Sequence, residues 1–276
     1  MPTTVADLAA AAEALWPAAG AEAWDAVGLV SGDPRASVER VLLAVDAVSD
    51  TVDEAIESRA DLLLTHHPLL LRGVTTVAAD RYKGAVISRL IKADCALLTA
   101  HTNADVVDDG TSGVLAERLG LRGAAPIASD AYGGGIGRVG DLAEATTLGR
   151  FASLVASVLP ATAGGVRVSG SYVRPVRRVA VCGGAGDAYL AAPAVLGADV
   201  YVTADLRHHP AQEAREQALL TGGPALVDVS HWASEWLWLE IAAAALRAAL
   251  PGVEFIVSEL RTDPWDFAVL SGGDDG

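Results

Sequence analysis

The chain has 276 residues, of which 51% are apolar and 20% are charged, and its formal net charge is −15. This length and apolar content predict a folded protein with a large core and exclude a mainly disordered chain. The negative charge argues against nucleic acid or an anionic membrane as the main partner, so we expect neither. Cys95 and Cys182 each lie in an apolar run, and the first residues lack a secretory pattern, so we expect a cytoplasmic protein with reduced cysteines.

The first half of the chain alternates short apolar runs with alanine-rich stretches of helical character. We predict strands at Arg40–Asp46, Asp61–Thr65 and Ala96–Ala100, and helices at Ser49–Arg59 and Tyr82–Ala93. The order strand, helix, strand, helix, strand is typical of an α/β layer with parallel strands. After Leu121 the chain is rich in glycine, and 133-GGGIGRVGDL-142 predicts a turn that leads into an edge strand, followed by a helix near Thr147–Val158.

The pattern of the first half returns later in the chain. The segments 177-RRVAVCGG-184 and 198-ADVYVT-203 align with 39-ERVLLAVD-46 and 60-ADLLLT-65 at one offset of 138 residues. At an offset of 130 residues, 226-LVDVSH-231 aligns with 96-ALLTAH-101. We therefore predict an α/β fold of two related lobes, formed by internal duplication, at residues 1–130 and 178–276, with a glycine-rich bridging segment at 131–177. Chance similarity between apolar strands is the alternative.

All six histidines of the chain follow predicted strands, and carboxylates accompany them. These residues are His66, His67, His101, Asp105, Asp205, His208, His209, His231 and Glu235. Because ligands of open α/β sheets bind at the carboxyl ends of the strands, we expect these residues to form a site, with the metal site between the two lobes.

The residue types and their spacing point to a metal site. Imidazole nitrogen and carboxylate oxygen are common ligands of divalent transition metals. His231 and Glu235 are four residues apart in the predicted helix 231-HWASEWLWLEIAAAALRAAL-250, so both can reach one ion. Successive side chains of a strand point in opposite directions, so we expect the His66 and His67 rings to serve two neighbouring ions, bridged by a carboxylate.

Several neighbouring residues have two interpretations. Arg207, His208 and His209 either contact an anionic substrate or cap a solvated loop, and Asp205 is either a site residue or a structural carboxylate. The glycine-rich 182-CGGAGD-187 could expose amides to a phosphate, but it lacks both the dinucleotide fingerprint and the P-loop lysine.

At these residues the chain resembles the GTP cyclohydrolase 1 type 2 homologue family, also called the Nif-three-like dinuclear-metal hexameric proteins. The matching segments are 24-WDAVGL-29, 65-THHP-68, 101-HTNAD-105, 135-GIGRVGDL-142, 182-CGGAG-186, 199-DVYVTAD-205, 231-HWASE-235 and 263-DPWDF-267. The chain departs from the family pattern at Ala26, Ala204 and Ser230, where members usually have Asn, Gly and Gly, but none of these is an expected ligand. The resemblance implies a two-lobed α/β fold, a dinuclear metal centre and a homohexamer.

The resemblance also implies roles for the site residues. His67 and Asp105 would bind one ion, His66 and His231 would bind the other, and Glu235 would bridge the two. His101 would lie outside the ligand set and orient Asp105. The remaining candidates for the surroundings of the metals or for substrate contacts are Asp205, Arg207, His208 and His209. The two divalent ions could be zinc, manganese, iron or cobalt.

We therefore expect a metal-dependent hydrolase, either GTP cyclohydrolase-like or a phosphoesterase, that acts on a nucleotide or another phosphorylated small molecule. Glu235, as the bridging ligand, is the one residue with an expected catalytic part. The alternative is a non-enzymatic hexameric assembly in which metal binding is structural or regulatory, and this alternative needs the same ligands.

Overall fold

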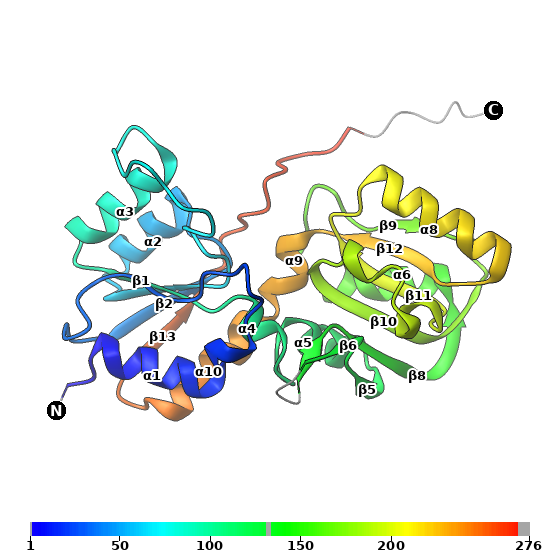
Figure 1. The fold of residues 1–276 in the computed structure, drawn as a ribbon, viewed down its shortest axis with the longest axis horizontal. Helices are drawn as coiled ribbons and strands as arrows, with labels where there is room; N and C mark the ends of the chain where they lie inside the picture. Colours follow the sequence, from blue (N-terminus) through cyan, green and yellow to red (C-terminus); the bar gives the residue numbers. More distant parts are fainter. Residues whose placement is uncertain (1, 131–133, 270–276) are drawn as a thin grey trace. The chain divides into compact units, whose positions relative to one another are not determined.

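The structure, a computed structural model, describes residues 2–130 and 134–269, and it divides into two compact units (Figure 1). Unit 1 comprises Met1–Leu115, Ala128–Gly137 and Glu235–Thr262. Unit 2 comprises Ala116–Ile127, Arg138–Ser234 and Asp263–Gly276. Each unit combines a sheet with helices, which confirms the predicted α/β class.

The sheet of unit 1 has five strands in the order β1-β4-β3-β2-β13. Strands β4, β3, β2 and β13 are parallel to one another, and β1 is antiparallel to β4. The three central strands are almost entirely buried, as expected for parallel strands covered on both faces. The strand bounds are β1 Gly28–Ser31, β2 Arg40–Ala44, β3 Leu62–Thr65, β4 Ala96–Thr99 and β13 Glu254–Val257.

Helices cover both faces of this sheet (Figure 1). Helices α2 (Ser49–Glu57) and α3 (Tyr82–Lys92) connect β2 to β3 and β3 to β4, and they pack on one face through a buried apolar cluster that includes Leu42, Val52 and Leu63. Helices α1 and α10 contact each other on the opposite face. The order strand, helix, strand, helix, strand was predicted and is confirmed. The other elements of this part are α1 Val5–Leu15, η1 Ala18–Gly20, α4 Thr102–Asp105, β6 Ala128–Ser129, β7 Gly135–Ile136 and α10 Trp238–Ala249. Helices α5 (Thr111–Arg118) and α9 (His231–Trp236) each include residues of both units.

The sheet of unit 2 has six strands in the order β5-β8-β10-β11-β12-β9. Strands β10, β11 and β12 are parallel, while β8 and β9 run antiparallel to their neighbours β10 and β12. The elements are β5 Arg122–Ala125, β8 Arg138–Thr147, α6 Leu148–Val158, β9 Arg167–Ser169, β10 Pro175–Ala185, η2 Asp187–Tyr189, α7 Pro193–Leu196, β11 Val200–Ala204, α8 His208–Thr221 and β12 Ala225–Val229. None of the helices in the described part of the chain combines the length and the apolar character that crossing a membrane requires.

Two sequence predictions about these elements were wrong. The strand that follows the glycine-rich stretch, β8, is not an edge strand, because β5 pairs along its outer side; Gly133 of that stretch lies outside the described residues. The predicted helix 231–250 is divided at Leu237 into α9 and α10, although Leu237 keeps helical backbone angles.

The two sheets share a local geometry at the predicted offset of 138 residues. The Asp61 carboxylate accepts hydrogen bonds from the amides of Glu39 and Arg40 at 2.7 and 2.9 Å. The Asp199 carboxylate accepts the same two bonds, both at 2.8 Å, from the amides of Arg177 and Arg178. An internal duplication would produce this recurrence.

The strand registers refine the repeat. Val41 pairs with Leu62 in unit 1, and Val179 pairs with Val200 in unit 2, again at an offset of 138. The third strands, β4 and β12, have a different offset: Leu62 pairs with Ala96 in unit 1, and Val200 pairs with Ala225 in unit 2. The sheet registers therefore give an offset of 129 for the third strands, one residue less than the sequence alignment gave.

Candidate metal centre

The histidine doublet lies directly after β3, at the carboxyl end of the sheet of unit 1. His66 is fully buried, and its Nδ1–H donates a hydrogen bond of 2.9 Å to the carbonyl oxygen of Ala100. Within the described part of the chain, His66 Nε2 has no hydrogen-bond partner. A buried imidazole nitrogen without a partner is costly unless a ligand completes it. His66 therefore offers a lone pair that fits a metal ion.

His67 is held on both sides of its ring. Its Nδ1 lies 2.7 Å from Asp46 Oδ1, and its Nε2 lies 2.9 Å from Glu235 Oε2. The rings of His66 and His67 are neighbours, with centroids 5.2 Å apart. Strand alternation, on which the prediction of two ions was based, does not govern these two rings, because β3 ends at Thr65.

His101 joins this doublet at the end of the next strand, β4. One ligand atom from each of His66, His67 and His101 lies within 4.8 Å of the other two, close enough to surround an ion. The Asp25 carboxylate contacts His101 Nδ1 at 2.9 Å and also accepts the amide of Thr102 at 3.0 Å and its hydroxyl. Asp25, rather than Asp105, is thus the carboxylate that pairs with the His101 ring.

Four histidines of the chain share the same hydrogen-bonding arrangement at Nδ1. The Nδ1 atom of each is engaged by a fixed oxygen: Ala100 for His66, Asp46 for His67, Asp25 for His101 and, in unit 2, Asp205 for His231 at 2.7 Å. Metal-binding histidines usually hold their second ring nitrogen in this way, which fixes the ring and leaves the other nitrogen for the metal. The arrangement therefore fits a metal centre that uses Nε2 ligands.

Two carboxylates complete the group in unit 1. Glu235 is buried on α9, and Asp105 ends α4, where its carboxylate accepts the Thr111 hydroxyl. His66 Nε2 lies 3.6 Å from Glu235 Oε1 and 3.7 Å from Asp105 Oδ1. These separations are too long for hydrogen bonds, but they resemble the spacing of roughly 3.3 Å between two ligands that each lie about 2 Å from one zinc ion.

The pKa shifts of these side chains indicate that their surroundings favour positive charge. Burial lowers the pKa of His67, but the charges of Glu235 and Asp46 outweigh it and raise that pKa to about 10. The pKa of His66 is also raised, because Glu235 and Asp105 outweigh its burial. Burial, together with the charge of Glu235, raises the pKa of Asp105. A divalent cation could supply the positive charge that these carboxylates favour.

Asp25 shows the opposite shift. Burial by itself would raise the pKa of Asp25, but hydrogen bonds from His101, Thr102 and the amide of Ala26 hold it far below its usual range. This carboxylate is therefore a permanent negative charge beside the His101 ring.

The remaining candidates lie around the start of α8 and the glycine-rich stretch. Arg207 donates to Asp187 at 2.7 Å, so its guanidinium is already paired. His208 and His209 are exposed and begin α8, a few residues beyond the end of β11 at Ala204. Asp205 has a left-handed backbone with φ of 56° and holds His231.

The stretch 182–187 belongs largely to β10, which extends to Ala185. The amide of Gly184 donates to Ser234 Oγ at 2.9 Å, and a side chain at Gly186 would come within 2.2 Å of the Tyr201 hydroxyl. The glycines therefore serve backbone pairing and close packing, and this stretch does not form a phosphate loop.

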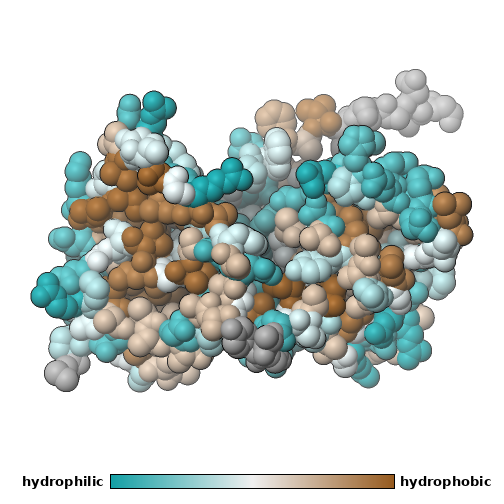
Figure 2. Space-filling view, in the orientation of Figure 1, coloured by the Kyte–Doolittle hydropathy of each residue, from teal (hydrophilic) through white to brown (hydrophobic). Residues whose placement is uncertain are grey.

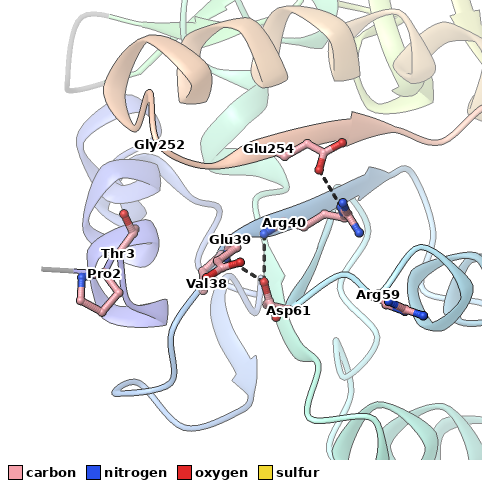
Figure 3. Close-up of a pocket in the computed structure, with 9 residues that line it drawn as sticks. All are labelled: Pro2, Thr3, Val38, Glu39, Arg40, Arg59, Asp61, Gly252 and Glu254. Atoms are coloured by element: carbon pink, nitrogen blue, oxygen red, sulfur yellow. Dashed lines mark hydrogen bonds and ion pairs between the residues drawn. The ribbon is translucent and has the colours of Figure 1, made fainter.

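A cavity of about 610 Å³ lies at the other end of the unit 1 sheet, near the amino ends of β2 and β13 (Figure 3). Of its charged groups, Arg40 and Glu254 form an ion pair at 2.7 Å, and the Asp61 carboxylate accepts the amides of Glu39 and Arg40. The histidines lie at the carboxyl ends of the same sheet, so this cavity is not part of the metal centre.

Sequence reasoning missed the roles of Asp25 and Asp46. Asp46 ends the predicted strand Arg40–Asp46, whose observed part β2 pairs with β3, and Asp25 lies within the family segment 24-WDAVGL-29, so both carried a signal that was available. It also missed the aromatic surroundings, in which Trp238 lies 5.3 Å from His66 and Trp24 lies 5.9 Å from His101, between ring centroids.

The fold and the site define an α/β protein whose histidine and carboxylate groups could hold divalent metal ions. The family model DUF34/NIF3 (NGG1p interacting factor 3) matches residues 3–264. The chain belongs to this family, which confirms the resemblance seen in its motifs.

Curated relatives and solved structures agree with this assignment. A Streptomyces coelicolor protein named GTP cyclohydrolase 1 type 2 homolog is 48% identical, with 97% of this chain and 95% of the relative covered. A Mycobacterium leprae protein of the same name is 33% identical, with 96% of each chain covered. Among solved structures, a Bacillus cereus protein related to NIF3 has a TM-score of 0.89 at 25% identity, and a hypothetical protein of Staphylococcus aureus has 0.87 at 30% identity. In both cases 97% of this chain and 100% of the neighbour are covered.

Proposed function

We propose that the centre binds two divalent metal ions and that the protein is a metal-dependent hydrolase acting on a nucleotide or another phosphorylated small molecule. The position of Glu235 carries this proposal. Its Oε1 faces His66 Nε2 at 3.6 Å, and its Oε2 faces His67 Nε2 at 2.9 Å. A carboxylate that presents one oxygen to each of two imidazoles suits bridging of two ions.

The distances suggest how the ligands are shared. Asp105 lies beside His66, so we assign these two residues to one ion and His67 to the other. His231 begins α9 one turn before Glu235, and we keep it as a ligand of one of the two ions, as the family resemblance implies. The pairing of Asp105 with His66 differs from the resemblance, which pairs Asp105 with His67. Imidazole and carboxylate ligands suit zinc, manganese, iron or cobalt.

The chemistry follows from the centre and its surroundings. A pair of divalent ions supplies electrophilic activation and water of lowered pKa, which suits hydrolysis. The chain contributes a buried setting, because His66 and Glu235 are shielded from solvent. It also contributes the His101 ring, whose Nδ1 is engaged by Asp25 and whose Nε2 is left for a proton or a hydrogen bond from a substrate.

The substrate class rests on the relatives and on the chemistry. The curated relatives bear the name GTP cyclohydrolase 1 type 2 homolog, so GTP is the first compound to test. No motif of the sequence recognises guanine, and the same centre would suit phosphoester hydrolysis, so phosphomonoesters and phosphodiesters are the second group.

The test is metal analysis of purified protein, followed by turnover assays with GTP and the phosphoesters before and after metal removal. About two ions per chain with turnover that needs them would support the proposal. Glu235→Ala should abolish both, whereas the exposed Glu57→Ala is the matched control and should change neither. Two ions without turnover on any compound would favour the non-enzymatic, regulatory assembly instead, and fewer than one ion would refute the metal centre.

We also propose a homohexamer in the cytoplasm, on the strength of the family resemblance and of two buried cysteines that form no disulfide in the described part of the chain. Light scattering coupled to gel filtration should give a mass about six times the 28.2 kDa of one chain. A monomeric mass would contradict the assembly without affecting the metal centre.

A further inference from the structure

A second cavity lies entirely within unit 2, beneath helix α8, and the proposed function does not use it. It has a volume of about 340 Å³ and is bounded by the inner side of α8, by β12 and by the edge strand β9. Figure 1 shows α8, drawn in yellow, beside β9 and β12. This volume is within the range of small-ligand sites.

The cavity exists because α8 does not pack closely on the sheet. None of the fourteen residues of α8 is buried, which is unusual for a helix that lies beside a sheet. In Figure 2 the surface over α8 is mainly hydrophilic. His208, Ala211 and Arg215 follow one another at helical spacing and line the cavity, so one face of the helix is turned towards it.

The floor of the cavity is apolar. Leu206, Leu226 and Val168 line it, and Leu226 is buried. A ligand with a compact apolar body would remove this surface from water, which is the usual source of affinity in such sites.

The charged groups around this floor are mainly basic. Asp228 is the one acid among the lining residues, and both of its oxygens are engaged: Oδ1 accepts the amide of Leu206 at 2.9 Å, and Oδ2 accepts two bonds from Arg167. Arg167 lies directly opposite Asp228 in the β9–β12 ladder, so this pair is part of the wall. The acid is therefore neutralised and does not repel an anion.

Arg215 is different, because it makes no hydrogen bond or ion pair with any residue that the structure describes. The acidic neighbours of Arg215 on α8, Glu213 and Glu216, are not among the residues that line the cavity. A chain of net charge −15 thus presents an unpaired guanidinium in the lining of an apolar cavity, which His208 also lines. Guanidinium groups bind phosphate and carboxylate through charge-assisted hydrogen bonds.

We infer that the cavity beneath α8 binds a small organic anion, with its apolar body on the β12 and β9 side chains and its phosphate or carboxylate group at Arg215. None of the ligands proposed for the metal centre is among the residues that line this cavity.

The test uses 4-fluorophenyl phosphate as the probe and follows its ¹⁹F NMR line width during titration of the full chain. Metal-free protein in a chelating buffer is used, so that the metal centre cannot hold the phosphate. We expect saturable broadening with 4-fluorophenyl phosphate and little with 4-fluorophenol, which lacks the anionic group.

Two variants and a control locate the binding. Arg215→Gln should weaken probe binding by about tenfold or more, as expected for loss of a charge-assisted contact. Ala211→Phe keeps every charge but fills the cavity, and it should abolish binding. Arg150→Gln removes an exposed arginine from α6 of the same unit and should leave binding unchanged.

Absence of saturable broadening would overturn the inference, as would equal binding by Arg215→Gln and Arg150→Gln. Broadening that survives Ala211→Phe would place the probe elsewhere and would also overturn it. None of these outcomes depends on whether the metal centre is catalytic, because the protein is metal-free throughout.

Discussion

Asp46 provides the sharpest test of the metal centre, because it contacts a predicted ligand without being one. Its Oδ1 lies 2.7 Å from His67 Nδ1, and its Oδ2 accepts the hydroxyl of Thr262. In Asp46→Asn the amide oxygen can still accept the His67 Nδ1–H, so the ring should keep its orientation. The substitution removes the negative charge that makes the His67 ring a stronger ligand.

The expected magnitude follows from the role of such partners. Loss of a group that orients and polarises a metal-binding histidine typically costs 10- to 100-fold in metal affinity, or about 1.4–2.7 kcal/mol. We therefore expect Asp46→Asn to bind zinc about 10- to 100-fold more weakly than the wild type. Competition with a chromophoric chelator at fixed pH measures this change.

The control variant makes the same change of charge at an exposed site. Asp50→Asn lies in the first turn of α2 and should bind zinc as the wild type does. A second comparison is Asp25→Asn, whose partner His101 is not an assigned ligand, so its effect should be smaller than that of Asp46→Asn. Equal zinc affinity in Asp46→Asn and Asp50→Asn would refute the assignment of His67 as a ligand.

Four further predictions concern the centre and the fold. Glu235→Ala should lose both ions together in elemental analysis, because one carboxylate is assigned to both, and retention of one ion would exclude bridging. His66→Ala and His67→Ala should each lose one ion, and the remaining ion should differ in affinity between the two variants; wild-type stoichiometry in both would remove the basis for two sites. The pKa of His67 is raised to about 10 when no metal is bound, so protonation of His67 stabilises the folded protein. This contribution to stability is fully present below pH 6.5 and is lost as the pH rises through 10. A metal ion must displace that proton, so the affinity of the centre for zinc should rise with pH over the accessible range of about 6 to 9. Calorimetry in buffers of different ionisation enthalpy detects the released proton. A zinc affinity that does not change with pH would contradict the raised pKa of His67. Gly84→Ala would place a Cβ 2.2 Å from a backbone oxygen and should cost about 1–3 kcal/mol in chemical denaturation, whereas Gly73→Ala meets nothing within 4 Å and should be nearly neutral.

The sequence determined the local features of this protein. Apolar runs and helical periodicity placed β2, α2, β3, α3 and β4 to within about two residues of the observed bounds, because these patterns are set by neighbours along the chain. The histidine doublet and the two acids that each follow a histidine by four residues also identified a candidate metal site before any tertiary contact was known.

Only the tertiary structure decided how the site is held together. The carboxylates that fix His67 and His101 lie 21 and 76 residues away in the chain, and no local pattern encodes such distances. The orientation of the doublet, the proximity of Asp105 to His66 and the pairing of β5 with β8 likewise depend on segments that meet only after folding. The residue types of the proposed ligands can therefore be read from the sequence. The orientation of each ligand side chain depends on long-range hydrogen bonds and packing, which only the folded structure provides.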